Sequence, residues 1–130
     1  MPSAKKAVLT QAAPAPIGPY SQAIRHGNFL FCSGQVPIDP SNGQILAGAS
    51  VEDYTRQVME NLGAVLKEAG ATFDHIVKTT IFLKSMADFP RVNEIYGSYF
   101  KGTPPARSTI EVARLPKDAI VEIEAIAMID

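Results

Sequence analysis

The sequence lacks most of what marks secreted or membrane-spanning proteins. It contains a single cysteine, Cys32, and no tryptophan. One cysteine cannot form an intramolecular disulfide, and this favours a reducing compartment. No apolar run approaches the roughly 20 residues that a membrane-spanning helix needs, and residues 1–10 hold no apolar stretch with a cleavage signal. We therefore expect a soluble, cytoplasmic protein that does not enter the membrane.

An excess of charge of one sign is also missing. Twelve basic and 13 acidic residues give a formal net charge of −1, without a run of like charges. Binding to a phosphate backbone usually needs a clustered basic face, so the sequence disfavours nucleic acid as the main partner. Lys78, Lys84 and Arg91 could form only a small basic patch, and a solvated surface is the simpler explanation for them.

Motifs for metals, cofactors and nucleophiles are absent as well. His26, His75 and Cys32 lie far apart, at no spacing that resembles a metal site, and we expect both histidines to be exposed. The glycines fit no phosphate-binding fingerprint. Cys32 falls in the middle of an expected strand, where a small buried side chain is expected rather than a nucleophile. The sequence therefore predicts neither a metal nor a cofactor.

What the sequence does have is the composition of one globular domain over residues 1–130, with 46% hydrophobic and 19% charged residues. Hydrophobic periodicity predicts helices from Ser50 to Gly70 and over about 88–100. It predicts strands over 21–26, 28–36, 76–84, 107–113 and 119–128, and a short one near 7–10. We expect the last two long strands to pair around the turn at 115–118. The order β-β-α-β-α-β-β predicts an α+β fold with both helices on one face of the sheet.

Two of the expected strands are apolar on both faces. In 28–36, Phe29 and Phe31 alternate with Leu30 and Cys32, and 119–128 carries aliphatic residues at both parities. In an antiparallel sheet with one wet face, apolar and polar residues alternate cleanly, and two helices can cover only one face. We therefore expect the second face to pack against other copies of the chain in a closed oligomer.

The side chains that could carry chemistry lie in the C-terminal strands. Arg107 begins a strand after two prolines, and its guanidinium matches a carboxylate bidentately; an ordinary surface ion pair is the alternative. Glu122 lies on a partly apolar strand face, where its pKa can rise toward a value useful in acid–base catalysis. A structural ion pair is the alternative for Glu122, and Glu124 could be that structural member. Tyr20 fits either the rim of a site or a cover of the core.

Several longer runs form an ordered set along the chain. They are Ile17-Gly18-Pro19-Tyr20-Ser21-Gln22-Ala23, Ser33-Gly34-Gln35-Val36-Pro37, Val77-Lys78-Thr79-Thr80, Asp88-Phe89-Pro90-Arg91-Val92-Asn93-Glu94-Ile95-Tyr96, Pro105-Ala106-Arg107-Ser108, Val112-Ala113-Arg114-Leu115-Pro116-Lys117-Asp118 and Val121-Glu122-Ile123-Glu124-Ala125. Any one run is a weak signal. All of them, in this order and at this spacing, resemble the RidA family, also called YjgF/YER057c/UK114, over nearly the whole chain.

The resemblance implies a chorismate-mutase-like fold assembled as a homotrimer, with clefts between subunits. It also implies hydrolysis of reactive enamines and imines, such as 2-aminoacrylate, 2-iminopropanoate and 2-iminobutanoate, to 2-keto acids and ammonia without a cofactor. Two other functions stay open. One is an endoribonuclease that inhibits translation, as some relatives were described, and the other is a non-catalytic regulator that binds small carboxylates.

The resemblance also implies roles for individual residues. Arg107 matches the arginine of the family's Pro-Ala-Arg-Ser run and is expected to clamp the substrate carboxylate. Glu122 matches the family's water-handling glutamate. Thr109 stands where many members have a cysteine, and it is expected to bind substrate mainly through its backbone. The other expected cleft residues are Tyr20, Ser33, Gly34 and Asn93.

Overall fold

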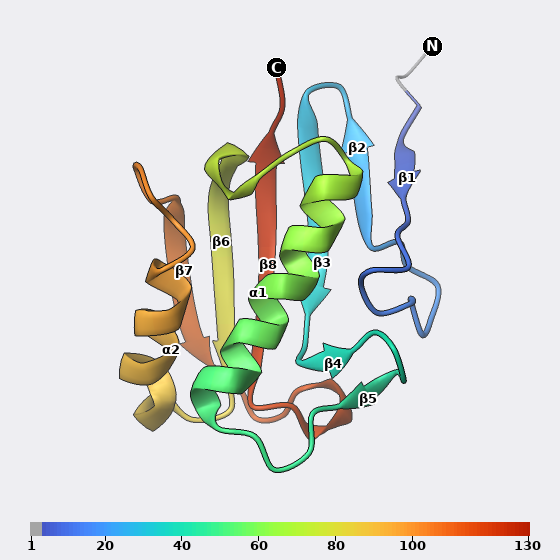
Figure 1. Ribbon diagram of the computed structural model, residues 1–130. Helices are drawn as coiled ribbons and strands as arrows, with labels where there is room; N and C mark the ends of the chain where they lie inside the picture. Colours follow the sequence, from blue (N-terminus) through green and yellow to red (C-terminus); the bar gives the residue numbers. More distant parts are fainter. Residues whose placement is uncertain (1–3) are drawn as a thin grey trace.

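The computed structural model describes residues 4–130, and its main feature is a six-stranded sheet with two helices on one face (Figure 1). The strands are β1 (Lys6–Val8), β2 (Ala23–His26), β3 (Phe29–Gln35), β6 (Ile76–Leu83), β7 (Ala106–Glu111) and β8 (Val121–Met128). Their order is β1-β2-β3-β8-β6-β7, and every neighbouring pair is antiparallel except β6 and β7. A small hairpin joins β4 (Ile38–Asp39) to β5 (Gln44–Ile45). The predicted α+β class is confirmed.

Serine hydrogen bonds and a glycine with positive φ mark the ends of the helices. In α1 (Val51–Glu68), the Ser50 hydroxyl accepts the Asp53 N–H at 3.1 Å, and Gly70 follows with a φ of +80°. The second helix, α2 (Phe89–Gly97), is shorter than predicted, and the Ser98 hydroxyl donates to the Ile95 carbonyl at 2.6 Å at its end. Over residues 4–130, neither helix combines the length and apolarity that crossing a bilayer requires.

The hydrophobic core lies between the helices and the sheet. Alternate residues of β8, from Val121 to Ala127, are buried beneath α1. The α1 residues that share this core are spaced three and four apart, as an amphipathic helix requires: Val58, Met59, Leu62, Val65 and Leu66. The expected inward face of β8 is confirmed.

The predicted pairing of the last two strands is wrong. β8 lies between β3 and β6, while β7 lies at the edge and runs parallel to β6. β8 is buried at every second position and suits a central place, whereas five of the six β7 residues are exposed. The connection through α2 makes β6-α2-β7 a crossover unit, which gives parallel neighbours rather than a hairpin.

A second difference concerns Val77, which the periodicity places with Ile81 and Leu83. The register of β6 against β8 shifts between Ile76 and Lys78, and Val77 is 46% exposed while Ile81 and Leu83 are fully buried. The irregularity changes the alternation at the start of β6, so the expected face is wrong for Val77 and right for the other two.

The face of the sheet that α1 and α2 leave uncovered is here called the open face. Phe29, Phe31 and Met128 lie on it and are 43%, 45% and 42% exposed. The register places Phe31 between Ile24 and Ile126, and its ring lies 6.0 Å from that of Phe29. Strands that are apolar on both faces are thus confirmed, and residues 4–130 leave one of these faces uncovered.

Candidate functional site

A cavity of about 400 Å³ lies where β3 ends and β8 begins. It joins three segments that are far apart in the sequence: the loop before β2, the end of β3, and the turn that leads into β8. Its lining residues are Ile17, Tyr20, Ser33, Gly34, Val36, Ile38, Pro116, Lys117, Glu122 and Glu124. Four of the predicted site residues, Tyr20, Ser33, Gly34 and Glu122, therefore come together in one place.

Glu122 is a carboxylate in the wall of this cavity. The alternation of β8 directs it to the open face, where it is half-buried. Burial, and secondarily the nearby Glu124 carboxylate, raise the pKa of Glu122. Residues 4–130 provide no ion-pair partner for it. The structural ion pair considered from the sequence is therefore not formed in the part of the chain that the structure describes.

Gly34 lets the backbone of β3 approach the Glu122 side chain. A Cβ at position 34 would collide with the Glu122 carboxyl group, lying 2.8 Å from its Cδ. The pairing of β3 with β8 shifts register between Cys32 and Gln35, so a β-bulge displaces the strand at this point. Bulges next to functional sites re-aim side chains, and this one leaves only the space that a glycine fills.

The buried Gln22 side chain anchors the loop that carries Tyr20 through hydrogen bonds. The Gln22 side chain is 1% exposed, donates to the Thr10 and Pro14 carbonyls at 3.0 and 2.9 Å, and accepts the Thr10 N–H at 2.7 Å. Tyr20 is 49% exposed at the rim of the cavity. Beside it, the Ser33 hydroxyl donates to the Ser21 carbonyl at 2.6 Å. Tyr20 is thus a rim residue and not a cover of the core.

Arg107 lies elsewhere, at the sheet edge beneath α2. Its Nη1 donates to Asn93 Oδ1 at 2.7 Å, and its guanidinium carbon lies 5.2 Å from the centre of the Phe89 ring and 5.1 Å from that of Tyr96. The Tyr96 hydroxyl in turn bonds Thr79 Oγ1 at 2.6 Å. Arg107 therefore forms no ion pair with residues 4–130; one amide and two rings orient it, and most of its N–H donors stay available.

Thr109 follows Arg107 by two positions on β7, so both side chains point to the same face of the sheet. Its Oγ1 is buried and has no hydrogen-bond partner among residues 4–130. A buried hydroxyl without a partner is costly. The Thr109 hydroxyl is therefore an unsatisfied polar group beneath the surface at the edge of the sheet.

A single chain does not bring Arg107 and Glu122 together. Arg107 pairs with Thr79 and lies on the helix-covered side, whereas Glu122 pairs with Phe82 and points to the open face. β6 separates their strands, which places β7 about 9–10 Å from β8. The predicted residues therefore form two half-sites: Tyr20, Ser33, Gly34 and Glu122 in one, and Asn93, Arg107 and Thr109 in the other.

The sequence alone does not indicate two residues that orient Arg107. The apolar spacing of Phe89 and Tyr96 predicts only a hydrophobic helix face, yet the rings of both lie close to the guanidinium group that contacts Asn93. The signal was present in the spacing, because positions 89, 93 and 96 follow the three- and four-residue steps of one helical face. Nothing in that spacing indicates that the face meets an arginine of another strand.

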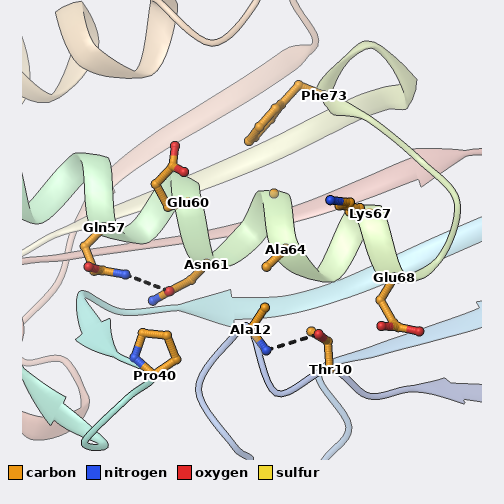
Figure 2. Close-up of a pocket in the computed structure, with 11 residues that line it drawn as sticks. Thr10, Ala12, Pro40, Gln57, Glu60, Asn61, Ala64, Lys67, Glu68 and Phe73 are labelled. Carbon is orange, nitrogen blue, oxygen red and sulfur yellow. Dashed lines mark hydrogen bonds between the residues drawn. The ribbon is translucent and has the colours of Figure 1, made fainter.

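A larger hollow of about 790 Å³ lies along the outer side of α1 (Figure 2). It holds none of the predicted site residues. Its central amide, Asn61, is buried and donates to the Val36 and Ile38 carbonyls at 3.2 and 2.9 Å while accepting from Gln57 at 2.8 Å. Because these bonds fasten α1 to the segment around β4, we assign the hollow a structural role.

Cys32, His26 and His75 lie in three different environments. Cys32 is buried, and burial raises the pKa of its thiol to about 12, so it is a core residue as predicted. His26 is exposed, whereas His75 is only partly so and caps the turn at Thr72. Within residues 4–130, no three His, Cys, Asp or Glu side chains are grouped as metal ligands would be.

Comparison with known proteins extends over nearly the whole chain. The family model described as Endoribonuclease L-PSP matches residues 10–129. A 2-iminobutanoate/2-iminopropanoate deaminase of Mus musculus is 51% identical over 124 residues, which cover 95% of this chain and 91% of that protein. The chloroplastic Reactive Intermediate Deaminase A of Arabidopsis thaliana is 51% identical over 123 residues, which cover 95% of this chain and 65% of that protein. The crystal structure of E. coli TdcF with bound serine has a TM-score of 0.91 at 43% identity and covers 96% of this chain and 99% of that one.

Proposed function

The chain belongs to the RidA family, whose model is described as Endoribonuclease L-PSP, and from this premise we propose that it hydrolyses 2-imino acids and their enamine tautomers to 2-keto acids and ammonia. The observation that carries the proposal is the state of two side chains. Arg107 is oriented with donors available, and Glu122 is a carboxylate of raised pKa without an ion-pair partner among residues 4–130. The names of the mouse and Arabidopsis relatives support the same chemistry.

The half-sites require a second copy of the chain. We propose a homotrimer in which the Arg107 half-site of one subunit meets the Glu122 cavity of its neighbour. The exposed Phe29, Phe31 and Met128 support this arrangement, because an apolar face of this kind is typical of an interface. A cyclic assembly repeats the same contact and gives one complete site at each boundary between copies.

Substrate binding is assigned to the Arg107 half-site. A guanidinium fork matches a carboxylate with two parallel hydrogen bonds, which fixes both the position and the rotation of the imino acid. Asn93, Phe89 and Tyr96 hold the fork before substrate arrives, so binding costs little reorganisation. Backbone groups at Ser33, Gly34 and Thr109 are those that would hold the water or the leaving nitrogen.

The chemical step is assigned to Glu122. Its carboxylate accepts a proton from a water molecule while the water oxygen bonds to the C=N carbon and the electron pair of that bond moves to nitrogen. Glu122 then donates that proton to the nitrogen of the carbinolamine, and the C–N bond breaks as the hydroxyl oxygen forms the C=O bond of the keto acid. The carboxylate takes up the hydroxyl proton and passes it to the departing ammonia, which leaves as ammonium and restores ionised Glu122. A protonated imine carbon is already electrophilic, so a positioned water and a base suffice for the reaction.

A coupled assay tests the proposed reaction. A dehydratase generates 2-iminopropanoate or 2-iminobutanoate, and the appearance of keto acid is followed with and without this protein. Arg107→Lys should lower kcat/KM by about 2–4 kcal/mol of transition-state stabilisation, roughly 30- to 1,000-fold. Glu122→Gln should abolish turnover and leave binding of a small carboxylate largely intact. Wild-type activity in the Arg107→Lys variant would overturn the assignment.

Mixing the Arg107→Lys and Glu122→Gln variants tests the shared site. If Arg107 and Glu122 act from different copies, random trimers formed after joint refolding of both variants should regain roughly a quarter of the wild-type sites. If both residues act from one chain, every site keeps a defect and no activity returns. Each variant refolded alone is the control.

An endoribonuclease remains the second candidate, because the family model carries that description. The small basic patch that Lys78, Lys84 and Arg91 could form gives it little support. Lys78 donates to the Ser108 hydroxyl, Lys84 to the Ala113 carbonyl, and Arg91 lies 3.5 Å from Asp88. RNA cleavage by purified protein that is lost on neutralising these three residues would favour the nuclease. A carboxylate-binding regulator, the third function considered, would retain ligand binding and show no turnover in the wild type.

A further inference from the structure

The turn that leads into β8 holds an unfavourable backbone conformation beside the cavity. Lys117 and Asp118 both have a φ of +56°, and among residues 4–130 they are the non-glycine residues in the left-handed region. Asparagine and aspartate tolerate this region better than other side chains, whereas lysine has no such preference. The strain is therefore concentrated at Lys117.

The surrounding structure holds this turn from both ends. Leu115 and Ala119 are buried, and the Asp118 and Ala119 N–H groups each donate back across the turn at 3.1 Å. Arg114 Nε donates to Asp118 Oδ1 at 2.7 Å. Strained residues persist where their surroundings over-determine them, and such residues cluster at functional sites. Lys117 is thus held in a backbone conformation that costs free energy, and asparagine or aspartate would adopt it at a lower cost.

Lys117 is the cationic residue of the cavity wall. The described lining otherwise consists of neutral residues and two carboxylates, Glu122 and Glu124. Lys117 is exposed and forms no ion pair or side-chain hydrogen bond with residues 4–130. Two carboxylates repel an anionic substrate, and a free ammonium group at the same wall opposes that repulsion.

We propose that Lys117 attracts the anionic imino acid to the Glu122 cavity, and that the strained turn serves to hold its ammonium group there. This inference rests on the proposed imine hydrolysis. Arg107 fixes the carboxylate of the bound imino acid, whereas Lys117 attracts the free imino acid as it approaches the cavity. Its removal should therefore change kcat/KM and leave kcat close to the wild-type value, and the change should depend on ionic strength.

Two substitutions separate the charge of Lys117 from its strain. Lys117→Asn removes the charge and places a side chain that tolerates positive φ, so it should lower kcat/KM about 3- to 10-fold at about 20 mM salt and raise Tm. The loss should disappear at about 0.5 M salt, where charges are screened over a few ångströms. Lys117→Arg keeps both features and should match the wild type. Lys67→Gln, an exposed lysine of α1, is the control for loss of one positive charge.

The outcomes distinguish this inference from the function on which it rests. If the wild type produces no keto acid from imines, the proposed function and the role of Lys117 both fail. If the wild type is active and Lys117→Asn keeps its full kcat/KM at low salt, only the role of Lys117 fails. A loss that persists at high salt, or that is accompanied by a lower Tm, would indicate a structural contribution and would also overturn the inference.

Discussion

The two residues assigned to the reaction are prepared by their surroundings in opposite ways. Arg107 is held by one amide and two aromatic rings, none of which satisfies its charge. Glu122 is half-buried next to another carboxylate, which makes its ionised form less stable than that of an exposed glutamate. One side chain is therefore ready to bind an anion, and the other is ready to accept a proton.

Gly34→Ala tests the close approach of β3 to Glu122. The added Cβ would collide with the Glu122 carboxyl group, so the carboxylate must move. A displacement of about 1 Å in a catalytic group can cost on the order of 100-fold in rate, and we expect kcat/KM to fall about 10- to 100-fold. Gly97→Ala, which adds a Cβ with nothing within 4 Å, is the matched control. Equal activity in both variants would contradict the proposed geometry.

The pH profile tests the state of Glu122. The base must be ionised, so kcat/KM should rise with pH, with a midpoint above the ordinary glutamate pKa of 4.5 because burial and Glu124 raise the pKa of Glu122. Glu124→Gln removes the like charge, lowers the pKa of Glu122 and should move this midpoint to lower pH. Glu68→Gln, a change on α1, should leave it in place. A midpoint that does not move on Glu124→Gln would assign the profile to another group.

At the scale of elements, irregular segments shape the cavity and regular ones support it. The β3 bulge gives Gly34 its place, the Gln22 contacts fix the loop of Tyr20, and the turn at Pro116–Asp118 carries Lys117. The straight strands and α1 form the buried layer behind them. The irregular segments thus shape the cavity wall, while the regular strands β7 and β8 carry Arg107 and Glu122.

Gln22→Ala tests the support of the early loop. The substitution leaves the Thr10 N–H and the Thr10 and Pro14 carbonyls without their partner in a largely buried place. We expect a loss of about 2–3 kcal/mol in the free energy of unfolding, measured by urea denaturation. The exposed Gln44 is the control, and its change to alanine should cost less than about 0.5 kcal/mol. Similar values for both variants would show that Gln22 does not anchor the loop.

At the scale of the whole molecule, the apolar open face joins the fold to the proposed assembly. Both helices cover the other face, so no helix or strand of the described residues buries Phe29, Phe31 and Met128. The same sheet directs Arg107 and Glu122 to opposite sides. One packing arrangement between copies therefore both covers the apolar surface and completes the site that we propose.

Phe31→Glu tests that arrangement. A carboxylate at this position on the open face would have to be buried between copies, which is costly without a partner. We expect the particle mass, measured by light scattering, to fall from three times the 14.0 kDa of the chain toward a single copy, with loss of imine turnover. Leu9→Glu places the same charge on an exposed residue outside the strands and should remain trimeric. A monomeric wild type with full activity would refute the shared site.

Prediction from the sequence succeeds where neighbouring residues decide the outcome. The α1 boundaries follow from Ser50 and Gly70, and the alternation of β8 follows from its own residue pattern. It fails where distant segments compete. β8 lies in the centre of the sheet because one of its apolar faces packs in the core, and β7 lies at the edge. The turn residues at 115–118 do not indicate this strand order. The bulge at Val77 is likewise a property of the paired strands.

The sequence, with its single cysteine, nearly balanced charge and ordered runs, by itself determined the family, the α+β class and the residue types of the candidate site. Residue types and their spacing can be read directly from the sequence, and the period of the apolar residues indicates whether a segment forms a helix or a strand. Only the tertiary structure decided that Arg107 and Glu122 lie on opposite faces, and that Phe89 and Tyr96 contact the guanidinium. The physical reason is that the order of strands in a sheet results from burying the most apolar surface of the whole chain at once.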